Sequence, residues 1–208
     1  MSTHSLKGKA ALIGGGAKNL GGLISRTFAA DGASICVHYN SASTKDDADK
    51  TVADIKAAGG EAFAISGDLT QVSEVVRVFA EAKKQLGGLD IAVNTAGKVL
   101  KKPFVETTEA DYDSMAAINS KAAYFFIQEA GKQLNDHGKI CTIVTSLLAA
   151  YTGLYSTYGG MKAPVEHFTR AASPSPPWVP DRWTRRSSTG KKRPKRWPTT
   201  NLLRRWAV

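Results

Sequence analysis

The sequence predicts an α/β fold with a doubly wound parallel sheet, and two observations support this prediction. Five short apolar runs rich in Ile, Val and Ala are typical of buried parallel strands. Longer segments with helical spacing of apolar residues separate these runs. Strands that alternate with helices imply right-handed crossovers and helices on both faces of the sheet. The expected strands are residues 10–13, 34–39, 61–65, 89–93 and 139–145.

The first expected strand runs directly into a glycine-rich turn, residues 14–22, and then into a helical pattern. Glycines let a backbone turn sharply and approach a pyrophosphate, whose charge is stabilised by the unpaired N–H groups of a helix N-terminus. Gly15, Asn19 and Gly21 follow the spacing G-x-x-x-N-x-G. This context favours a dinucleotide loop over a plain tight turn between a strand and a helix.

Candidate ligand-binding residues fall where the expected strands end. Asp68 follows the third strand, Asn94 ends the fourth, and Ser146 follows the fifth. Ligands of doubly wound sheets bind outside the carboxyl ends of the strands. The sequence therefore predicts one cleft formed by these segments and the glycine-rich turn.

A tyrosine and a lysine four residues apart, Tyr158 and Lys162, are candidates for proton transfer. Positions i and i+4 share one face of a helix, and a cation beside a phenol favours the phenolate. Tyr158 is therefore a candidate general acid/base, although the same spacing also occurs on ordinary solvated helix faces. Tyr151 and Tyr155 are rival phenols, but neither has a lysine four residues on.

In their order along the chain, these motifs resemble those of the short-chain dehydrogenase/reductase family, and the 3-oxoacyl-carrier-protein-reductase-like members in particular. The glycine-rich turn is similar to the family's cofactor loop, with Gly14 where that loop usually has threonine. Asp68 resembles an adenine-contacting aspartate. The segment Asn94-Thr-Ala-Gly97 resembles the family's Asn-Asn-Ala-Gly signature, with Thr95 at the second position. The resemblance implies a Rossmann-like fold and a catalytic tetrad of Asn119, Ser146, Tyr158 and Lys162.

The resemblance also implies a reaction, in which a nicotinamide cofactor exchanges a hydride with a carbonyl or alcohol substrate. Tyr158 would transfer the proton and Ser146 would orient the substrate oxygen. Lys162 would hold the nicotinamide ribose, and Asn119, on an expected helix from Asp111 to Leu134, would support a water relay. The expected cofactor-binding residues are Gly15, Lys18, Asn19, Leu20, Gly21, Asn40, Ser41, Asp68, Leu69, Asn94, Ala96, Gly97, Tyr158 and Lys162.

Charge near the second strand favours NADP(H) over NAD(H). An acid at the end of this strand would bind a ribose 2′-hydroxyl and repel a 2′-phosphate, but the strand ends without one. Lys18 in the glycine-rich turn is close enough in sequence to meet a 2′-phosphate, and Asn40 and Ser41 supply neutral donors. The alternative is that Lys18 is a solvated loop charge. We expect His38 to be a packed strand residue.

The composition changes sharply near residue 172. Residues 173–208 contain ten Lys/Arg and one acid, and so carry +9 of the net charge of +10. They also contain all four tryptophans and six of the eight prolines. Because like charges and prolines oppose packing, we expect residues 1–172 to form the domain and residues 173–208 to be a disordered basic tail.

Two interpretations of this tail are open. The basic run 191–196 is compatible with nuclear targeting or nucleic-acid binding. Alternatively, the tail has an out-of-frame origin. Relatives typically have a different peptide at this place, and its codons, read one nucleotide out of frame, can encode residues 173–190. We favour this out-of-frame origin and expect no nucleic-acid partner. By resemblance, the chain would then lack the family's last two strands. Two functions stay open: the NADP(H)-dependent reductase, and, as the alternative, a catalytically impaired remnant that binds dinucleotide or binds nucleic acid through the tail.

Further features restrict the setting of the protein. Cys36 and Cys141 fall in expected central strands, so buried thiols are favoured over a disulfide, in keeping with a cytoplasmic protein. No run of 18 apolar residues predicts a membrane span, and no N-terminal apolar segment predicts secretion. The four histidines lack the spacing of metal ligands, so no metal is expected. Full-length relatives are expected to be homo-oligomers.

Overall fold

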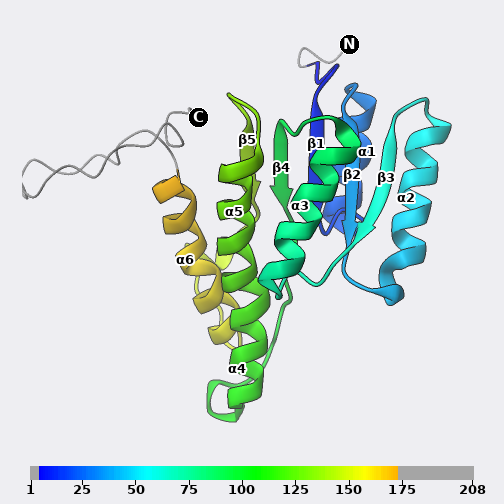
Figure 1. Ribbon diagram of the computed structural model, residues 1–208. Helices are drawn as coiled ribbons and strands as arrows, with labels where there is room; N and C mark the ends of the chain where they lie inside the picture. The colour runs from blue at the N-terminus through cyan, green and yellow to red at the C-terminus, as the bar shows by residue number, and fades with distance from the viewer. Residues whose placement is uncertain (1–4, 173–208) are drawn as a thin grey trace, which may run out of the picture.

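Five parallel strands form one sheet in the order β3-β2-β1-β4-β5 (Figure 1). The computed structural model describes residues 5–172, so the expected disorder of residues 173–208 lies outside the described residues. The strands are β1 (Ala10–Gly14), β2 (Ser34–Tyr39), β3 (Ala62–Ser66), β4 (Ile91–Asn94) and β5 (Lys139–Thr142). The α/β prediction is confirmed, and the main error in strand length is at β5, which ends three residues before the expected 145.

Helices cover both faces of the sheet (Figure 1). They are α1 (Asn19–Ala30), α2 (Lys45–Ala57), α3 (Val72–Leu86), α4 (Glu109–Ala116), α5 (Ala122–Gln133) and α6 (Ser156–Ala172). Helices α1 and α2 pack on one face of the sheet, whereas α3 and α5 pack on the other. The strand order reverses between β1 and β4, so the loops after these two neighbouring strands diverge and leave a crevice at the carboxyl edge of the sheet.

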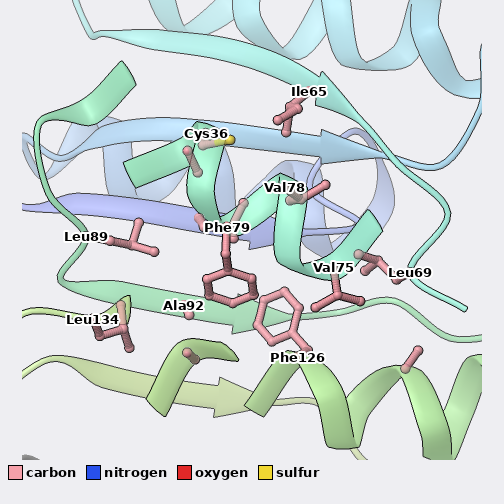
Figure 2. Close-up of a cluster of buried hydrophobic side chains, with 14 residues drawn as sticks. Cys36, Ile65, Leu69, Val75, Val78, Phe79, Leu89, Ala92, Phe126 and Leu134 are labelled. Atoms are coloured by element: carbon pink, nitrogen blue, oxygen red, sulfur yellow. The ribbon is translucent and has the colours of Figure 1, made fainter. Parts of the chain in front are cut away.

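The core on the α3 and α5 face is built around two aromatic rings (Figure 2). Phe79 of α3 and Phe126 of α5 are fully buried and meet edge to face, with ring centroids 4.8 Å apart. Such a pair contributes about 0.5–1.5 kcal/mol beyond its buried area. Phe126 also reaches the glycine-rich turn, because a Cβ added at Gly14 would lie 2.9 Å from its ring. The packed core therefore explains why Gly14 occupies a position at which the resembled loop has threonine.

The expected helical segment from Asp111 to Leu134 is confirmed to within two residues, but it contains a π-helical turn that the sequence did not predict. The chain forms α4, then a π-helical turn from Ala117 to Lys121, then α5. Asn119 lies in this turn, and its side chain bonds the backbone N–H and C=O of Lys98. π-Helical turns inside helices occur frequently at functional sites. The spacing of apolar residues could not reveal this turn, because the contact that accompanies it joins Asn119 to Lys98, in a loop 21 residues earlier in the chain.

The expectation for the two cysteines holds for only one of them. Cys36 is fully buried in β2, where loss of solvation raises the pKa of its thiol. Cys141 is exposed, which corrects the expectation of a second buried thiol. The physical reason is that β5 is an edge strand of the sheet in the described residues, so side chains on it have fewer neighbours.

Candidate active site

The turn between β1 and α1 has the shape of an anion site. Gly15 has φ +72° and Asn19 has φ +49°, and both values lie in the left-handed region that glycine and asparagine tolerate best. A Cβ at Gly21 would lie 2.1 Å from the carbonyl oxygen of Gly15, so only glycine fits there. No side chain caps the first turn of α1, which leaves its N–H groups available to an anion.

This turn forms one wall of a cleft of about 610 Å³. The cleft collects most of the residues expected to bind a cofactor, namely Gly15, Lys18, Asn19, Leu20, Gly21, Asn40, Asp68, Leu69, Ala96 and Gly97. The other four expected residues are not among the lining residues: Ser41, Asn94, Tyr158 and Lys162. Ser41 precedes a short 3-10 turn, Ala42–Thr44, and Asn94 is buried with its side-chain oxygen bonded to the N–H of Ala96. Asn94 therefore shapes the loop after β4.

Sequence reasoning missed several residues that line the cleft, including His38, Thr95, Ser114 and Ile118. His38 is packed in β2 as expected, but its ring also accepts a hydrogen bond from the N–H of Gly15. The hydroxyl of Thr95 donates to the carbonyl oxygen of Gly14 over 2.8 Å. For His38 and Thr95 the signal in the sequence was a polar side chain near the end of a strand, whereas Ser114 on α4 and Ile118 in the π-helical turn carried no such signal.

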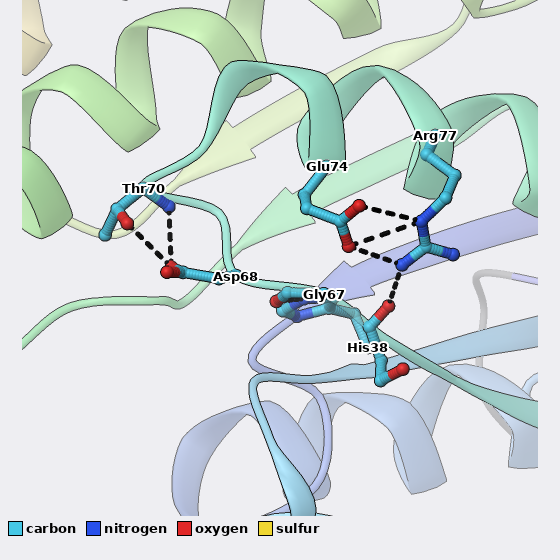
Figure 3. A network of polar contacts seen from close by, with 7 residues as sticks. His38, Gly67, Asp68, Thr70, Glu74 and Arg77 are labelled. Atoms are coloured by element: carbon cyan, nitrogen blue, oxygen red, sulfur yellow. Dashed lines mark hydrogen bonds and ion pairs between the residues drawn. The ribbon is translucent and has the colours of Figure 1, made fainter.

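Asp68 is held in a fixed orientation at the cleft wall (Figure 3). Its Oδ1 accepts hydrogen bonds from the backbone N–H of Thr70 at 3.0 Å and from the Thr70 hydroxyl at 2.8 Å. Its neighbour Leu69 is buried in the core. A carboxylate anchored in this way can accept hydrogen bonds from a ligand without first losing rotamer freedom.

Lys18 has a partner that the sequence did not predict. Its Nζ lies 2.9 Å from Oδ2 of Asp47, in the first turn of α2, and both side chains are about half exposed, at 50% and 43%. The lysine lines the cleft as expected. A negative group in the cleft would therefore compete with Asp47 for this ammonium, in a pair of the exposed kind that contributes little to stability.

Lys162 and Asn119 meet at Gly97. Lys162, on α6, is 3% exposed, and its Nζ donates a hydrogen bond to the carbonyl oxygen of Ile143 over 3.0 Å. Burial lowers the pKa of this lysine. Asn119 is fully buried, and a Cβ on Gly97 would lie 2.9 Å from its Oδ1 and 3.0 Å from Lys162 Nζ. Three expected site residues from separate segments thus converge on one point.

Tyr158 and Ser146 complete the expected tetrad at the same end of the sheet. Tyr158 lies one turn before Lys162 on α6 and is partly buried. Ser146 is exposed at the start of a 3-10 turn, Ser146–Leu148, which follows β5. The rival Tyr151 is 93% exposed, and the rival Tyr155 lines a separate groove. Of the three phenols, Tyr158 alone lies on α6 one turn from the buried lysine.

Two further findings concern the described residues alone. Among residues 5–172, no group of three or more His, Cys, Asp or Glu side chains is placed to hold a metal ion. Within the same range, no helix has the length and apolar character needed to cross a membrane.

The chain is similar to known proteins over most of the described residues. The sequence model of a family described as enoyl-(acyl carrier protein) reductase matches residues 15–175. The hydroxynaphthalene reductase-like protein Arp2 of Metarhizium brunneum is 41% identical over 170 residues, which are 81% of this chain and 62% of that protein. The chain thus spans less than two thirds of this curated relative.

Solved structures are similar in fold over the same region. A putative dehydrogenase from Burkholderia cenocepacia, with bound NADP, is 56% identical and superposes with a TM-score of 0.79 over 82% of this chain and 65% of that one. A blue fluorescent protein from a metagenomic library, in complex with NADPH, is 36% identical, with a TM-score of 0.75 over 81% of this chain and 68% of that one. The family match, the fold and the order of the site residues together show that this chain belongs to the short-chain dehydrogenase/reductase family.

Proposed function

We propose that this chain is an NADP(H)-dependent oxidoreductase that interconverts a carbonyl compound and its alcohol. The observation that carries the proposal is the convergence of Gly97, Asn119 and buried Lys162 beside the cleft behind the glycine-rich turn. A buried ammonium is costly unless it is paired and hydrogen-bonded. Within residues 5–172 its Nζ donates to the carbonyl oxygen of Ile143, and because an ammonium has three N–H donors, donors remain for a ribose or a water.

The cleft fits a dinucleotide. The uncapped N-terminus of α1 would bind the pyrophosphate, and the close approach that Gly15 and Gly21 permit would bring the backbone to it. Asp68 would accept hydrogen bonds from the adenine. The cofactor, when bound, supplies the hydride that reduces the carbonyl carbon.

The residues of the tetrad would handle the proton and the substrate oxygen. Tyr158 would donate its phenol proton to the alkoxide that develops on the substrate, and the Ser146 hydroxyl would hydrogen-bond the same oxygen and orient it. Lys162, whose pKa burial lowers, would return a proton towards the phenol more readily than an exposed lysine. Asn119 would fix the lysine's surroundings, because its amide is tied to both backbone groups of Lys98.

NADP(H) is the proposed form of the cofactor for two reasons. The end of β2 carries Asn40 and Ser41 and no acid, so nothing there repels a 2′-phosphate. Lys18 lines the cleft and supplies a positive charge within reach. The neighbouring structures with bound NADP and NADPH support the same choice.

The proposed substrate class is a ketone of the 3-oxoacyl type or a cyclic aromatic ketone. The 3-oxoacyl type rests on resemblance to 3-oxoacyl-reductase-like members, and the aromatic type on the description of the Metarhizium relative as hydroxynaphthalene reductase-like. Because Ser146 and Tyr158 present two hydroxyl groups, the site suits a substrate oxygen that gains negative charge.

The test is NADPH oxidation with a panel of both ketone classes, in the wild-type chain and in Tyr158→Phe. Tyr158→Phe should lower the rate about 10²–10⁴-fold, the usual effect of removing a positioned acid, with NADPH affinity retained. Tyr151→Phe, at an exposed phenol seven residues away, is the matched control and should leave the rate unchanged. Wild-type turnover that survives Tyr158→Phe would disprove the assigned role, and binding of NADPH without turnover of any ketone would leave only a dinucleotide-binding protein.

A further inference from the structure

His38 connects two segments that lie at the cofactor cleft. It is 2% exposed in β2, and its Nδ1 lies 3.1 Å from the backbone nitrogen of Gly15, which donates to it. On the other side of the ring, Nε2 lies 2.8 Å from the carbonyl oxygen of Gly67, directly after β3. One imidazole thus spans from the glycine-rich turn to the loop that carries Asp68.

These two partners fix the protonation state of the ring. A backbone N–H can only donate, so Nδ1 must be unprotonated, and a backbone carbonyl can only accept, so Nε2 must carry the proton. In a protonated ring Nδ1 would also carry an N–H, and this donor would point at the N–H of Gly15, which is a donor too. In agreement, burial lowers the pKa of His38 to about 4, with a smaller lowering from Arg77 and opposing effects of the Gly67 hydrogen bond, Asp68 and Glu74.

The Gly15 peptide is held from three elements. His38 binds its N–H from β2, and Thr95, at the end of β4, directs its hydroxyl at the carbonyl oxygens of Gly14 and Gly15, at 2.8 and 3.3 Å. From α1, Gly21 packs so closely that a Cβ would lie 2.1 Å from the Gly15 oxygen. A loop held in this way can place the first N–H groups of α1 without reorganisation when an anion arrives.

We propose that His38 is a positioning residue of the dinucleotide site, which acts by holding the N–H of Gly15 and thereby setting the glycine-rich turn for the pyrophosphate. The role rests on the proposed binding of NADP(H). It assigns His38 no contact with the reacting atoms. Its effect should therefore appear in cofactor affinity and in KM for NADPH, with kcat at saturating cofactor nearly unchanged.

Two substitutions separate this role from simple packing. In His38→Asn the side-chain oxygen replaces Nδ1 and keeps an acceptor for Gly15, whereas in His38→Gln the longer amide replaces Nε2 and keeps the donor to Gly67. Each variant loses one of two buried hydrogen bonds, so we expect similar falls in the unfolding temperature. NADP⁺ affinity should fall on the order of tenfold in His38→Gln and less than about threefold in His38→Asn, because only the first leaves the Gly15 N–H without a partner.

Isothermal titration of NADP⁺ into the full chain and both variants measures this difference. Cys36→Ala is the matched control, because Cys36 is buried in the same strand two residues earlier, and its loss should lower stability and leave NADP⁺ affinity unchanged. Wild-type binding with equal affinities for the Asn and Gln variants would overturn the role of His38 alone. A wild-type chain that does not bind NADP⁺ would overturn the dinucleotide assignment and this role with it.

Discussion

The Nζ of Lys162 donates a hydrogen bond to the carbonyl oxygen of Ile143, 3.0 Å away, from a position that is 3% exposed. Ile143 directly follows β5, so the hydrogen bond ties α6 to the edge of the sheet. The lysine is thus placed by the backbone of another element, and its charge is kept away from solvent. Substitution of Lys162 can therefore be used to measure both its effect on the reaction rate and its effect on the free energy of unfolding.

Lys162→Met should lower the rate of ketone reduction by about 10²–10⁴-fold, because the ammonium that supports the phenol is lost while the aliphatic stem is kept.

Burial lowers the pKa of Lys162 in the folded state, so between that lowered pKa and the unfolded value the unfolded chain binds more protons. Wild-type stability should therefore rise with pH across this alkaline window, whereas the Met variant should lack the rise. Denaturant unfolding at several pH values measures it, and identical profiles would contradict it.

Gly97→Ala should harm catalysis more than cofactor binding. The added methyl would lie 2.9 Å from Asn119 Oδ1 and 3.0 Å from Lys162 Nζ, so both polar groups must shift. A misplacement of about 1 Å can cost on the order of 10²-fold in rate. Single-turnover rates and NADPH titration measure the two effects. Gly131→Ala, in α5 where a Cβ meets nothing within 4 Å, is the control and should leave both unchanged.

Asp47→Asn should increase affinity for NADPH about two- to fivefold and leave affinity for NADH unchanged, because it frees the ammonium of Lys18 from an exposed ion pair. Lys18→Met should weaken NADPH binding in both backgrounds. The control is Asp49→Asn, which changes the net charge equally but breaks the Lys45 pair on the same helix. Fluorescence titration of both cofactors checks the result, and equal gains for NADPH and NADH would refute the assignment of Lys18 to the 2′-phosphate.

His38 should make stability fall on the acid side of neutrality. Its pKa is lowered from 6.5 to about 4 in the folded state, so between these values the unfolded chain carries the extra proton and stability decreases as pH falls. Over this window the loss amounts to about 3 kcal/mol. Urea unfolding of wild type and His38→Asn from pH 7 to 4 isolates the contribution as the difference between them. A constant difference would show that the ring does not titrate in this way.

Gly159→Ala and Gly160→Ala should each stabilise the protein by about 0.5–1 kcal/mol. Both glycines lie inside α6, and a Cβ at either would meet nothing within 4 Å, so alanine gains helix propensity without a clash. Thermal unfolding measures the gain. Destabilisation by either change would mean that α6 needs the freedom of glycine next to Tyr158.

Local patterns in the sequence predicted the elements and the location of the site. The alternation of apolar runs and helical spacing gave five strands within a few residues, and the glycine spacing placed Gly15 and Gly21 at the first turn. The resemblance of short motifs then assigned Asn119, Ser146, Tyr158 and Lys162 to one centre. The element predictions succeed because strand and helix periodicities and glycine conformations are properties of neighbouring residues. The roles of the four tetrad residues stay a prediction.

Only the tertiary structure decided how distant side chains meet. It paired Lys18 with Asp47, placed Phe126 against Gly14, and formed the π-helical turn at Asn119. It also left Cys141 exposed on an edge strand and turned His38 from a packed residue into a partner of Gly15. The physical reason is that such contacts depend on strand order, register and rotamers, which bring together residues far apart in the sequence. Asn119 and Lys98 are 21 positions apart, and Phe126 and Gly14 are more than a hundred apart.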